Sequence, residues 1–214
     1  MPYPRFHELP TARREAVLTA AAQEFADRGY EAASVNRIIG AAGISKGTLY
    51  YYFEDKEDLF ASAMEQAMQR LLDQSGFVPA HALTAATFWN TFRKNMRRSM
   101  EYMEGDNAYV RLARSFHQLR ATAPSSTAAH RIVDMIAGYV RQIIERGQEL
   151  GVVRTDLPVP LLVEVTLAVD EAGDRWRIKH WDDFTHEERL VHADAQLDLM
   201  RDMLHADYQG WEEP

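Results

Sequence analysis

A hydrophobic repeat of three and four residues runs along nearly the whole of this 214-residue chain. It is clearest where Phe88, Phe92, Met96 and Met100 follow one another at intervals of four. Side chains at such intervals share one face of an α-helix, whereas a half-buried strand needs apolar residues at alternate positions. The sequence has no strand-like alternation with hairpin turns. The pattern therefore predicts an all-α fold.

Breaks between the predicted helices fall where glycine, proline, asparagine and serine gather. Such clusters occur at residues 76–79, 105–107 and 124–126. Asp55 can cap a long helix, and a domain boundary is expected inside that helix, so that two domains sharing it would be rigidly coupled. The last helix is expected over residues 185–207.

Composition excludes several classes of protein. Hydrophobic residues make up 46% of the chain and charged residues 26%, which is ordinary globular usage and excludes a disordered chain or a fibre. No stretch approaches the roughly 18 apolar residues of a membrane span, and the first residues lack the order of a secretory signal. The absence of cysteine excludes disulfides and thiolate sites and favours a cytoplasmic location.

Motifs for catalysis or metal binding are missing from the sequence. The eight histidines form no cluster with ligand spacing, and no HExxH occurs. There is no phosphate-cradling glycine loop, no GxSxG nucleophile turn and no acidic pair that stands out as a catalytic dyad. We therefore expect no metal, no cofactor and no enzymatic activity.

Charge is unevenly distributed along the chain. The net charge of −8 by itself argues against a polyanionic partner. Residues 1–56 are neutral, however, with seven basic and seven acidic side chains, so the acidic excess lies entirely after them. Between Ala32 and Phe53 the only charged residues are Arg37 and Lys46. A polyanion such as DNA can approach this acid-free segment.

The acid-free segment predicts two short helices separated by a glycine turn. Ser34 can cap the first helix and Ser45 the second, and Gly43 breaks the chain between them. This arrangement is a helix-turn-helix. In that motif the second helix enters the major groove of DNA, N-terminal end first.

The second helix opens with Lys46, Gly47 and Thr48 and continues with tyrosines at residues 50–52. Gly47 lets the backbone approach DNA, and Lys46 and Thr48 can reach base edges or phosphates. Successive helical residues differ by about 100°, so three consecutive tyrosines cannot all face the core. At least one tyrosine hydroxyl should therefore be free to donate to a phosphate.

This region resembles the DNA-binding signature of the tetracycline-repressor-like (TetR) family of bacterial regulators. The similar residues are Gly43-Ile44-Ser45-Lys46-Gly47-Thr48-Leu49-Tyr50-Tyr51-Tyr52-Phe53, with Lys56-Glu57-Asp58-Leu59 after them and Phe25-Ala26-Asp27-Arg28-Gly29-Tyr30 before them. The resemblance covers about residues 11–60. The C-terminal part is similar to the family only loosely, chiefly at residues 151–157.

The resemblance implies a fold and a function. It implies an N-terminal three-helix helix-turn-helix domain over residues 1–55, joined through a long helix to a C-terminal helical ligand-binding and dimerisation domain over residues 56–210. It also implies a homodimeric transcriptional repressor that binds a pseudo-palindromic operator in double-stranded DNA and is released by a small-molecule effector. The DNA contacts that it implies are Ser34, Arg37, Ser45, Lys46, Gly47, Thr48, Tyr50, Tyr52 and Lys56.

The middle helices would enclose the effector. Candidate ligand-binding residues are Phe88, Phe92, Met96, Phe116 and Glu164. A stripe of aromatic residues and methionines is more often core than pocket wall. Glu164 lies in an apolar run, so its carboxylate must be paired, hydrated or facing a ligand, and it can equally occupy the solvated side of its helix.

A hydrophobic seam marks the last helix. Its residues, spaced three, four, three and four, are Leu190, Ala193, Leu197, Met200 and Leu204. The preceding helix offers a matching line of Leu161, Val165, Ala168 and Ala172. Such seams pack helix on helix, and we predict that these two helices form the dimer interface. The alternative is that the seam packs within its own chain, as in single-chain bundles.

Two other functions stay open. One is a ligand-independent DNA-binding protein that is regulated by a protein partner, which a well-packed core without a pocket would favour. The other is a small-molecule-binding or enzymatic all-α domain whose N-terminal helices never meet DNA. An absence of salt-sensitive DNA binding would favour the second.

Overall fold

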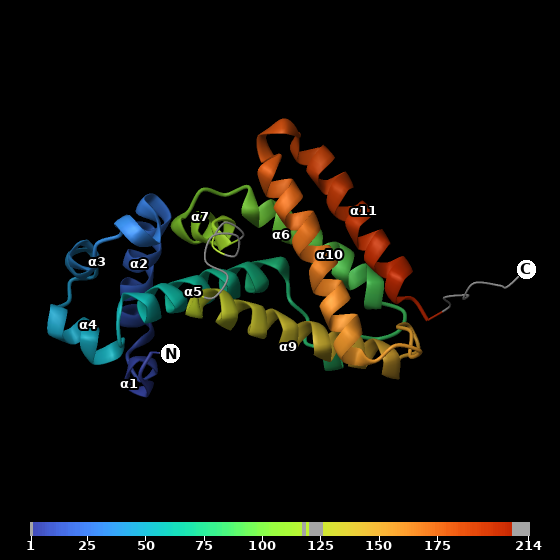
Figure 1. The fold of residues 1–214 in the computed structure, drawn as a ribbon, viewed down its shortest axis with the longest axis horizontal. Helices are drawn as coiled ribbons and strands as arrows, with labels where there is room; N and C mark the ends of the chain where they lie inside the picture. Colours follow the sequence, from blue (N-terminus) through green and yellow to red (C-terminus); the bar gives the residue numbers. More distant parts are fainter. Residues whose placement is uncertain (1, 117–118, 120–125, 207–214) are drawn as a thin grey trace, which may run out of the picture. The chain divides into compact units, whose positions relative to one another are not determined.

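The secondary structure in the computed structural model is helical, apart from an isolated antiparallel bridge between Val153 and His205, over the residues that the structure describes. These residues are 2–116, 119 and 126–206 (Figure 1). The fold confirms the all-α prediction. The predicted turn at Pro124-Ser125 and the predicted end of the last helix at Asp207 lie outside the described residues.

Four helices form the N-terminal part of the chain. They are α1 (Pro4–His7), α2 (Thr11–Ala32), α3 (Val35–Ala42) and α4 (Lys46–Tyr52). Gly29 interrupts α2 with a φ of +70°, a left-handed conformation that glycine adopts without strain. Helix α3 packs against α2 and α4, as Figure 1 shows in blue and cyan.

The described residues after α4 form further α-helices and two short 3₁₀ turns. The α-helices are α5 (Lys56–Ser75), α6 (Phe88–Met103), α7 (Ala108–Arg114), α9 (Thr127–Glu149), α10 (Val159–Lys179) and α11 (His186–Leu204). The 3₁₀ turns are η1 (Ala80–Ala82) and η2 (Trp181–Asp183). Helix α11 begins with a capping box in which Thr185 and Glu188 satisfy each other's backbone N–H groups.

The chain divides into two compact units. The first consists of residues 1–73 and 103–133, and the second of residues 74–102 and 134–214. The first unit therefore contains most of α5, and α7, together with the helix-turn-helix. The predicted boundary between residues 55 and 56 falls inside this unit, so a division of function at that point stays a prediction.

The core of the first unit joins α2 to α5 and α7. The Phe60 ring of α5 lies 4.9 Å from the Phe25 ring of α2. Helix α7 packs on α2, where the hydroxyl groups of Tyr109 and Thr19 lie 3.0 Å apart. The helix-turn-helix thus rests on a core that includes the long helix α5.

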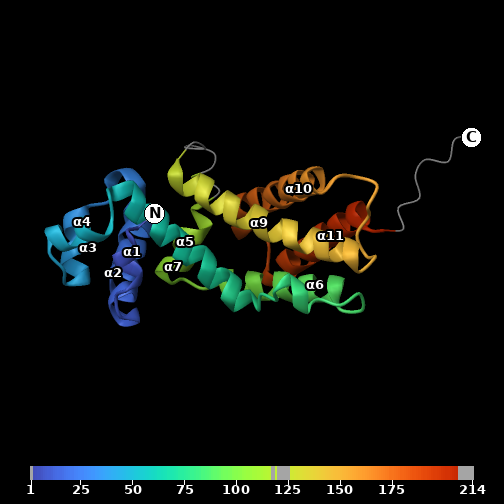
Figure 2. The same ribbon diagram turned by 90° about the horizontal axis from the view of Figure 1, so that it is seen from below.

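The core of the second unit gathers α6, α9, α10 and α11. Its buried residues are Leu83, Phe88, Ile143, Ile144, Val153, Leu162, Val163 and Leu204. Gly147 of α9 is required here, because a Cβ at this position would lie 2.8 Å from the Phe88 ring. Helices α10 and α11 lie side by side in Figures 1 and 2 and pack against each other.

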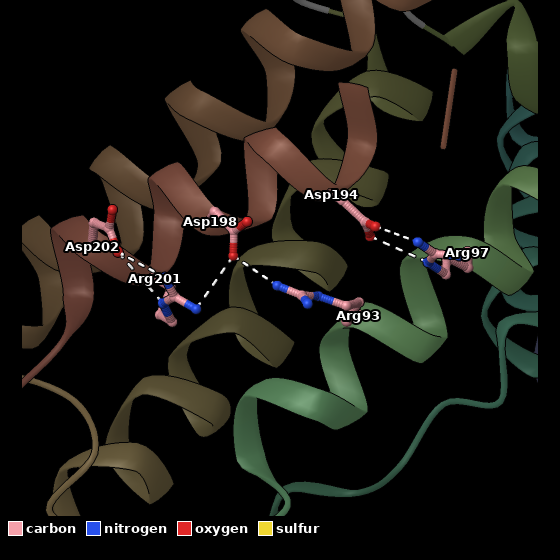
Figure 3. Close-up of polar contacts among 6 residues, drawn as sticks. All are labelled: Arg93, Arg97, Asp194, Asp198, Arg201 and Asp202. Carbon is pink, nitrogen blue, oxygen red and sulfur yellow. Dashed lines mark hydrogen bonds and ion pairs between the residues drawn. The ribbon is translucent and has the colours of Figure 1, made fainter. Parts of the chain in front are cut away.

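Ion pairs join α6 to α11 (Figure 3). The Arg93 guanidinium lies 2.7 Å from the Asp198 carboxylate, and Arg97 pairs with Asp194. Arg201 of α11 also binds Asp198, at 3.3 Å. Each pair is partly exposed, so each contributes no more than about 1 kcal/mol. None of the helices in the described ranges is both long enough and apolar enough to cross a bilayer.

Candidate nucleic-acid interface

Two serine caps and a left-handed glycine shape the helix-turn-helix. Ser45 Oγ accepts a hydrogen bond from the backbone N–H of Thr48 at 3.0 Å and so caps α4. Ser34 caps α3, where its Oγ accepts from the N–H of Arg37 at 3.4 Å. Gly43 ends α3 with a φ of +65°, which other residues rarely adopt. The two caps and the turn predicted from sequence are confirmed.

Helix α4 buries one side and exposes the other. Leu49 and Phe53, four residues apart, are 2% and 0% exposed and face the core. Tyr50 and Tyr51 are 41% and 53% exposed, and residues 45–47 at the front of the helix are exposed as well. The end that would enter a groove is therefore open to solvent.

The described structure contains no feature that requires glycine at position 47. Gly47 has a helical backbone, and a Cβ built there would meet nothing closer than Ser45 Oγ at 3.8 Å. Glycine inside a helix costs up to about 1 kcal/mol relative to alanine. Its missing side chain leaves the α4 backbone open to a molecule outside the protein. Thr48 and Tyr52, the other predicted contacts on this helix, are half-buried.

Arg37 is held by Glu24 of α2. Its guanidinium donates to both carboxylate oxygens over 2.6–3.0 Å, and Glu24 also accepts from the N–H of Ser34 at 2.8 Å. The hydrogen bond from Arg37 holds the pKa of Glu24 below its usual value. The positive charge of Arg37 is thus balanced within the protein, and these contacts fix α3 to α2.

Lys56 stands at the N-terminus of α5. Its Nζ donates to the carbonyl oxygen of Glu31 at 3.1 Å and lies 4.8 Å from the centre of the Tyr30 ring. No carboxylate among the described residues forms an ion pair with Lys56. A cation at a helix N-terminus is unfavourable for the helix dipole, so its position suits an external anion better than the helix itself.

Reasoning from sequence missed the short helix α1. Phe6 is 2% exposed, and its ring lies 4.7 Å from the ring of Phe53 at the end of α4. Pro4 at the first helical position, followed by one apolar aromatic residue, is the signal that a short docked helix precedes Thr11. The N-terminal segment therefore touches the helix-turn-helix from outside the predicted motif.

The predicted ligand-binding residues do not gather at one site. Phe88 is 1% exposed and belongs to the core of the second unit, with the Phe92 ring 5.1 Å away. Met96 is half-buried on the same helix. Phe116 is buried in the first unit, whereas Glu164 is exposed on α10. Phe88 thus serves as core, and Glu164 occupies the solvated side of its helix.

A shallow hollow lies between α6 and α11 in the second unit. Its lining residues are Trp89, Asn90, Arg93, Leu197, Asp198 and Arg201. Trp89 Nε1 is buried and has no acceptor among the described residues. The guanidinium groups of Arg93 and Arg201 converge on one carboxylate here (Figure 3). The hollow is therefore lined by two guanidinium groups and one carboxylate, next to a buried indole N–H.

The seam predicted in the last helix is buried within one chain. Ala193, Leu197, Met200 and Leu204 are at most 7% exposed, and Leu190 is half-buried. Leu204 belongs to the core of the second unit, and α11 packs against α10. The seam therefore packs within its own chain, as in the alternative stated above, because these side chains already have partners there.

Other apolar residues of the same two helices are exposed. Leu161 and Trp176 of α10 are 42% and 44% exposed, and Val191 and Leu199 of α11 are 65% and 60% exposed. Between the two α10 residues, at intervals of three and four, lie Val165, Ala168 and Ala172. These four large apolar side chains have little cover within the described chain.

Two comparisons at the level of sequence bear on this site. Residues 17–63 match the sequence model of a family described as bacterial regulatory proteins, tetR family. Over 162 residues the chain is 35% identical to the HTH-type transcriptional repressor AcnR of Corynebacterium glutamicum. That alignment covers 72% of this chain and 76% of the relative.

Solved structures share the fold at low sequence identity. TylP, a TetR regulator from Streptomyces fradiae, superposes with a TM-score of 0.68 at 16% identity, over 92% of this chain and 88% of its own. The transcriptional regulator FadR from Bacillus subtilis, in complex with stearoyl-CoA, gives a TM-score of 0.67 at 18% identity. Its alignment covers 89% of this chain and 98% of its own. The same helical fold therefore recurs in regulators of distant sequence.

Proposed function

This chain belongs to the TetR family of bacterial regulatory proteins, and we propose that it is a dimeric repressor that binds a pseudo-palindromic operator and is released by a small-molecule effector. Members of this family are transcription regulators and not enzymes, in agreement with the sequence analysis. The proposal that the protein represses transcription, and does not activate it, rests on the 35% identity to AcnR, which is named a repressor. Because bacterial DNA lies in the cytoplasm, the proposal includes a cytoplasmic location.

The open front of α4 is the observation that carries the DNA-binding proposal. Residues 45–47 are exposed. Position 47 is glycine although the surrounding structure has room for a side chain there. Glycine lowers the stability of the helix but leaves its surface flat at this position. A flat surface suits close approach of the helix backbone to the edges of DNA bases. Lys46, Thr48 and Tyr50 would contact bases or the groove wall, and Ser45 would stay as the cap.

Backbone phosphates would be bound around the same helix. Lys56, which has no carboxylate partner among the described residues, is the strongest of the predicted phosphate contacts. Tyr52 would donate its hydroxyl. Ser34 and Arg37 rank lower, because Glu24 balances the Arg37 charge and Ser34 caps α3.

Dimerisation follows from the symmetry of the proposed target. Two recognition helices must lie roughly 34–36 Å apart to enter successive major grooves of a palindrome. We assign the contact between copies to the exposed residues of α10 and α11, led by Leu161, Trp176, Val191 and Leu199. The seam around Leu197 stabilises each chain instead.

Effector release would act through α5. Arg70 of this helix binds Glu15 of α2 at 2.6 Å and lies 4.3 Å from the centre of the Tyr109 ring of α7. An effector that binds more tightly to an arrangement of these helices other than the DNA-binding one shifts the dimer away from the DNA-binding state by its difference in affinity. The hollow at Trp89 and Arg93 is lined by two guanidinium groups against one carboxylate, so it would suit a small effector with an anionic group that competes for these cations.

Selection of DNA from a random pool tests the function. The full-length protein should enrich a two-fold symmetric sequence, and binding should weaken steeply as salt rises. Fatty acyl-CoAs and lipophilic cations are suitable effector probes, the former because FadR was solved with stearoyl-CoA. A probe that lowers operator affinity supports effector control. An absence of salt-sensitive DNA binding would favour an all-α domain that never meets DNA. Operator binding that no small-molecule probe weakens, but that a protein partner controls, would favour a ligand-independent DNA-binding protein.

A further inference from the structure

Helix α1 is bound to the C-terminal end of α4. The backbone N–H of Tyr3 donates to the carbonyl oxygen of Tyr52 at 2.9 Å, and Nε of Arg5 donates to the carbonyl oxygen of Tyr51. The last carbonyl groups of a helix have no partner within that helix. Helix α1 therefore supplies the donors that these two carbonyls lack, and the contact of Phe6 with the core holds it in place.

The guanidinium of Arg5 lies against two tyrosine rings. Its Cζ is 4.4 Å from the centre of the Tyr3 ring and 3.9 Å from the centre of the Tyr51 ring. A cation over aromatic faces, at the carbonyl end of a helix, is held in one position. Because Tyr3 is 37% and Tyr51 is 53% exposed, the cation is fixed at the surface and not in the core.

The positive charge of Arg5 has no opposite charge beside it among residues 2–116, 119 and 126–206. No carboxylate among the described residues pairs with it, whereas Arg37 is paired with Glu24. Within the described part of the chain only its Nε is used, by the Tyr51 carbonyl, so the two terminal nitrogens of the guanidinium keep their donors. A planar pair of donors of this kind matches the oxygens of a phosphate group.

We infer that Arg5 binds a backbone phosphate of DNA at the C-terminal end of α4, and that α1 positions the Arg5 side chain there. The hydroxyl groups of Tyr3 and Tyr51, on the rings that hold Arg5, would donate beside it. This inference rests on the proposed DNA-binding function. It extends the DNA contacts from the helix-turn-helix to the segment before it. The competing role is purely structural, in which Arg5 only caps the end of α4.

A salt titration separates the two roles. Binding of the full-length protein to a random-sequence duplex would be measured by fluorescence anisotropy between 50 and 200 mM salt, a range over which phosphate contacts dominate the change. Arg5→Gln keeps a donor for the Tyr51 carbonyl but removes the charge. We expect about tenfold weaker binding at low salt and a log–log salt slope smaller by roughly 0.9. Arg5→Lys, which keeps the charge, should retain the slope and lose part of the affinity.

The matched control is Arg141→Ala, which removes one exposed charge from the second unit and should leave the slope unchanged. A wild-type slope in Arg5→Gln, with or without a lower melting temperature, overturns the inference and leaves the proposed function intact. If the wild-type protein itself shows no salt-sensitive binding, the proposed function fails and the inference fails with it.

Chemical labelling gives a second measurement that needs no variant. Wild-type protein would be treated with an arginine-selective dicarbonyl reagent, with and without the random-sequence duplex, and the labelled arginines identified by mass spectrometry. We expect DNA to protect Arg5 severalfold while Arg141 labels equally in both samples. Equal labelling of Arg5 in both samples, in protein that binds the duplex, overturns the inference.

Discussion

At Gly47 the stability of the protein and the binding of DNA make opposite demands. The protein has space for a Cβ at this position, with the nearest atom 3.8 Å away, and alanine is the better helix former. Gly47→Ala should therefore stabilise the fold by about 0.5 kcal/mol, the low end of the range because the site lies in the first turn. The same methyl group should hold α4 away from the groove and weaken operator binding by at least tenfold.

Denaturant titration measures the change in stability, and fluorescence anisotropy on the same preparation measures the change in operator affinity. Gly40→Ala is the matched control, because it also adds a methyl group to a helical glycine with open space around it, on α3. This control should gain stability without the same loss of affinity. Full operator affinity in Gly47→Ala would mean that the α4 backbone does not approach DNA closely.

The two kinds of contact around α4 should respond differently to substitution. Thr48→Ala and Tyr50→Ala should each reduce the preference for operator over random DNA, because a base contact is worth about 1–3 kcal/mol of discrimination. Lys56→Ala should weaken both kinds of binding and lower the salt slope by about 0.9, as expected for a lost phosphate contact. Titrations on both duplexes check this, and an unchanged sequence preference in Thr48→Ala and Tyr50→Ala would contradict our assignment of the recognition helix.

Local chemistry decides which residue roles can be predicted from sequence. Ser45 caps a helix that begins one residue later, so the sequence around it is sufficient to identify the cap. Arg37 is different, because Glu24 reaches it from another helix, 13 residues earlier in the chain. Arg5 is bound to Tyr51, which lies 46 positions away. Contacts of this kind depend on how the helices pack, so the sequence around each residue does not predict them.

Among the helices, α10 and α11 share a polar cluster inside their contact. The guanidinium of Arg177, 4% exposed, donates to Gln196 and Asp174, and Gln196 also lies 3.4 Å from a carboxylate oxygen of Asp170. Gly173 makes room for this cluster, because a Cβ there would collide with Gln196. Burial, with repulsion from Asp174, raises the pKa of Asp170 to about 7, although Arg177 opposes the shift.

The stability of this helix pair should depend on pH through Asp170. Because its pKa is raised in the folded state, the folded state binds the proton more tightly, and stability falls as pH rises from about 4 to about 7. Asp170→Asn should therefore be more stable than the wild type at pH 8, and the difference should shrink at pH 5. Urea unfolding of both proteins at the two pH values measures it, and equal stabilities at pH 8 would contradict the prediction.

Periodicity identified the helices but not the partner of each helical face. In α11, residues 190–204 carry the predicted seam, while Val191 and Leu199 form a second apolar row with its own spacing. Both rows suit helix packing. Only the folded chain shows that the first row is buried in its own unit and that the second is exposed. The sequence pattern alone contains no signal that separates these two rows.

At the scale of the whole molecule, these two rows predict opposite behaviour. Leu199→Glu should leave the chain folded and separate the dimer, because Leu199 is 60% exposed in one chain and two-fold symmetry would bury the new charge twice. Leu197→Glu should instead destabilise the chain itself by about 3 kcal/mol, because Leu197 is 7% exposed. Glu164→Gln, an exposed change on α10, serves as the control for both.

Light scattering at micromolar concentration and thermal unfolding read out these variants together. A fully dimeric Leu199→Glu protein would remove the exposed α11 row from the interface. A stable, monomeric Leu197→Glu protein would restore the buried seam as the interface, in agreement with the prediction from sequence.

The first unit is assembled from two separate stretches of the chain, residues 1–73 and 103–133. Helix α7, from the second stretch, binds α2 through Tyr109 and through an ion pair of Arg111 with Asp27 at 3.1 Å. A ribosome delivers roughly 5–20 residues per second, so α2 to α5 leave it a few seconds before α7 does. The nascent chain thus carries the recognition helix before its supporting core is complete, and a product released early by premature termination would lack the α7 that packs on α2.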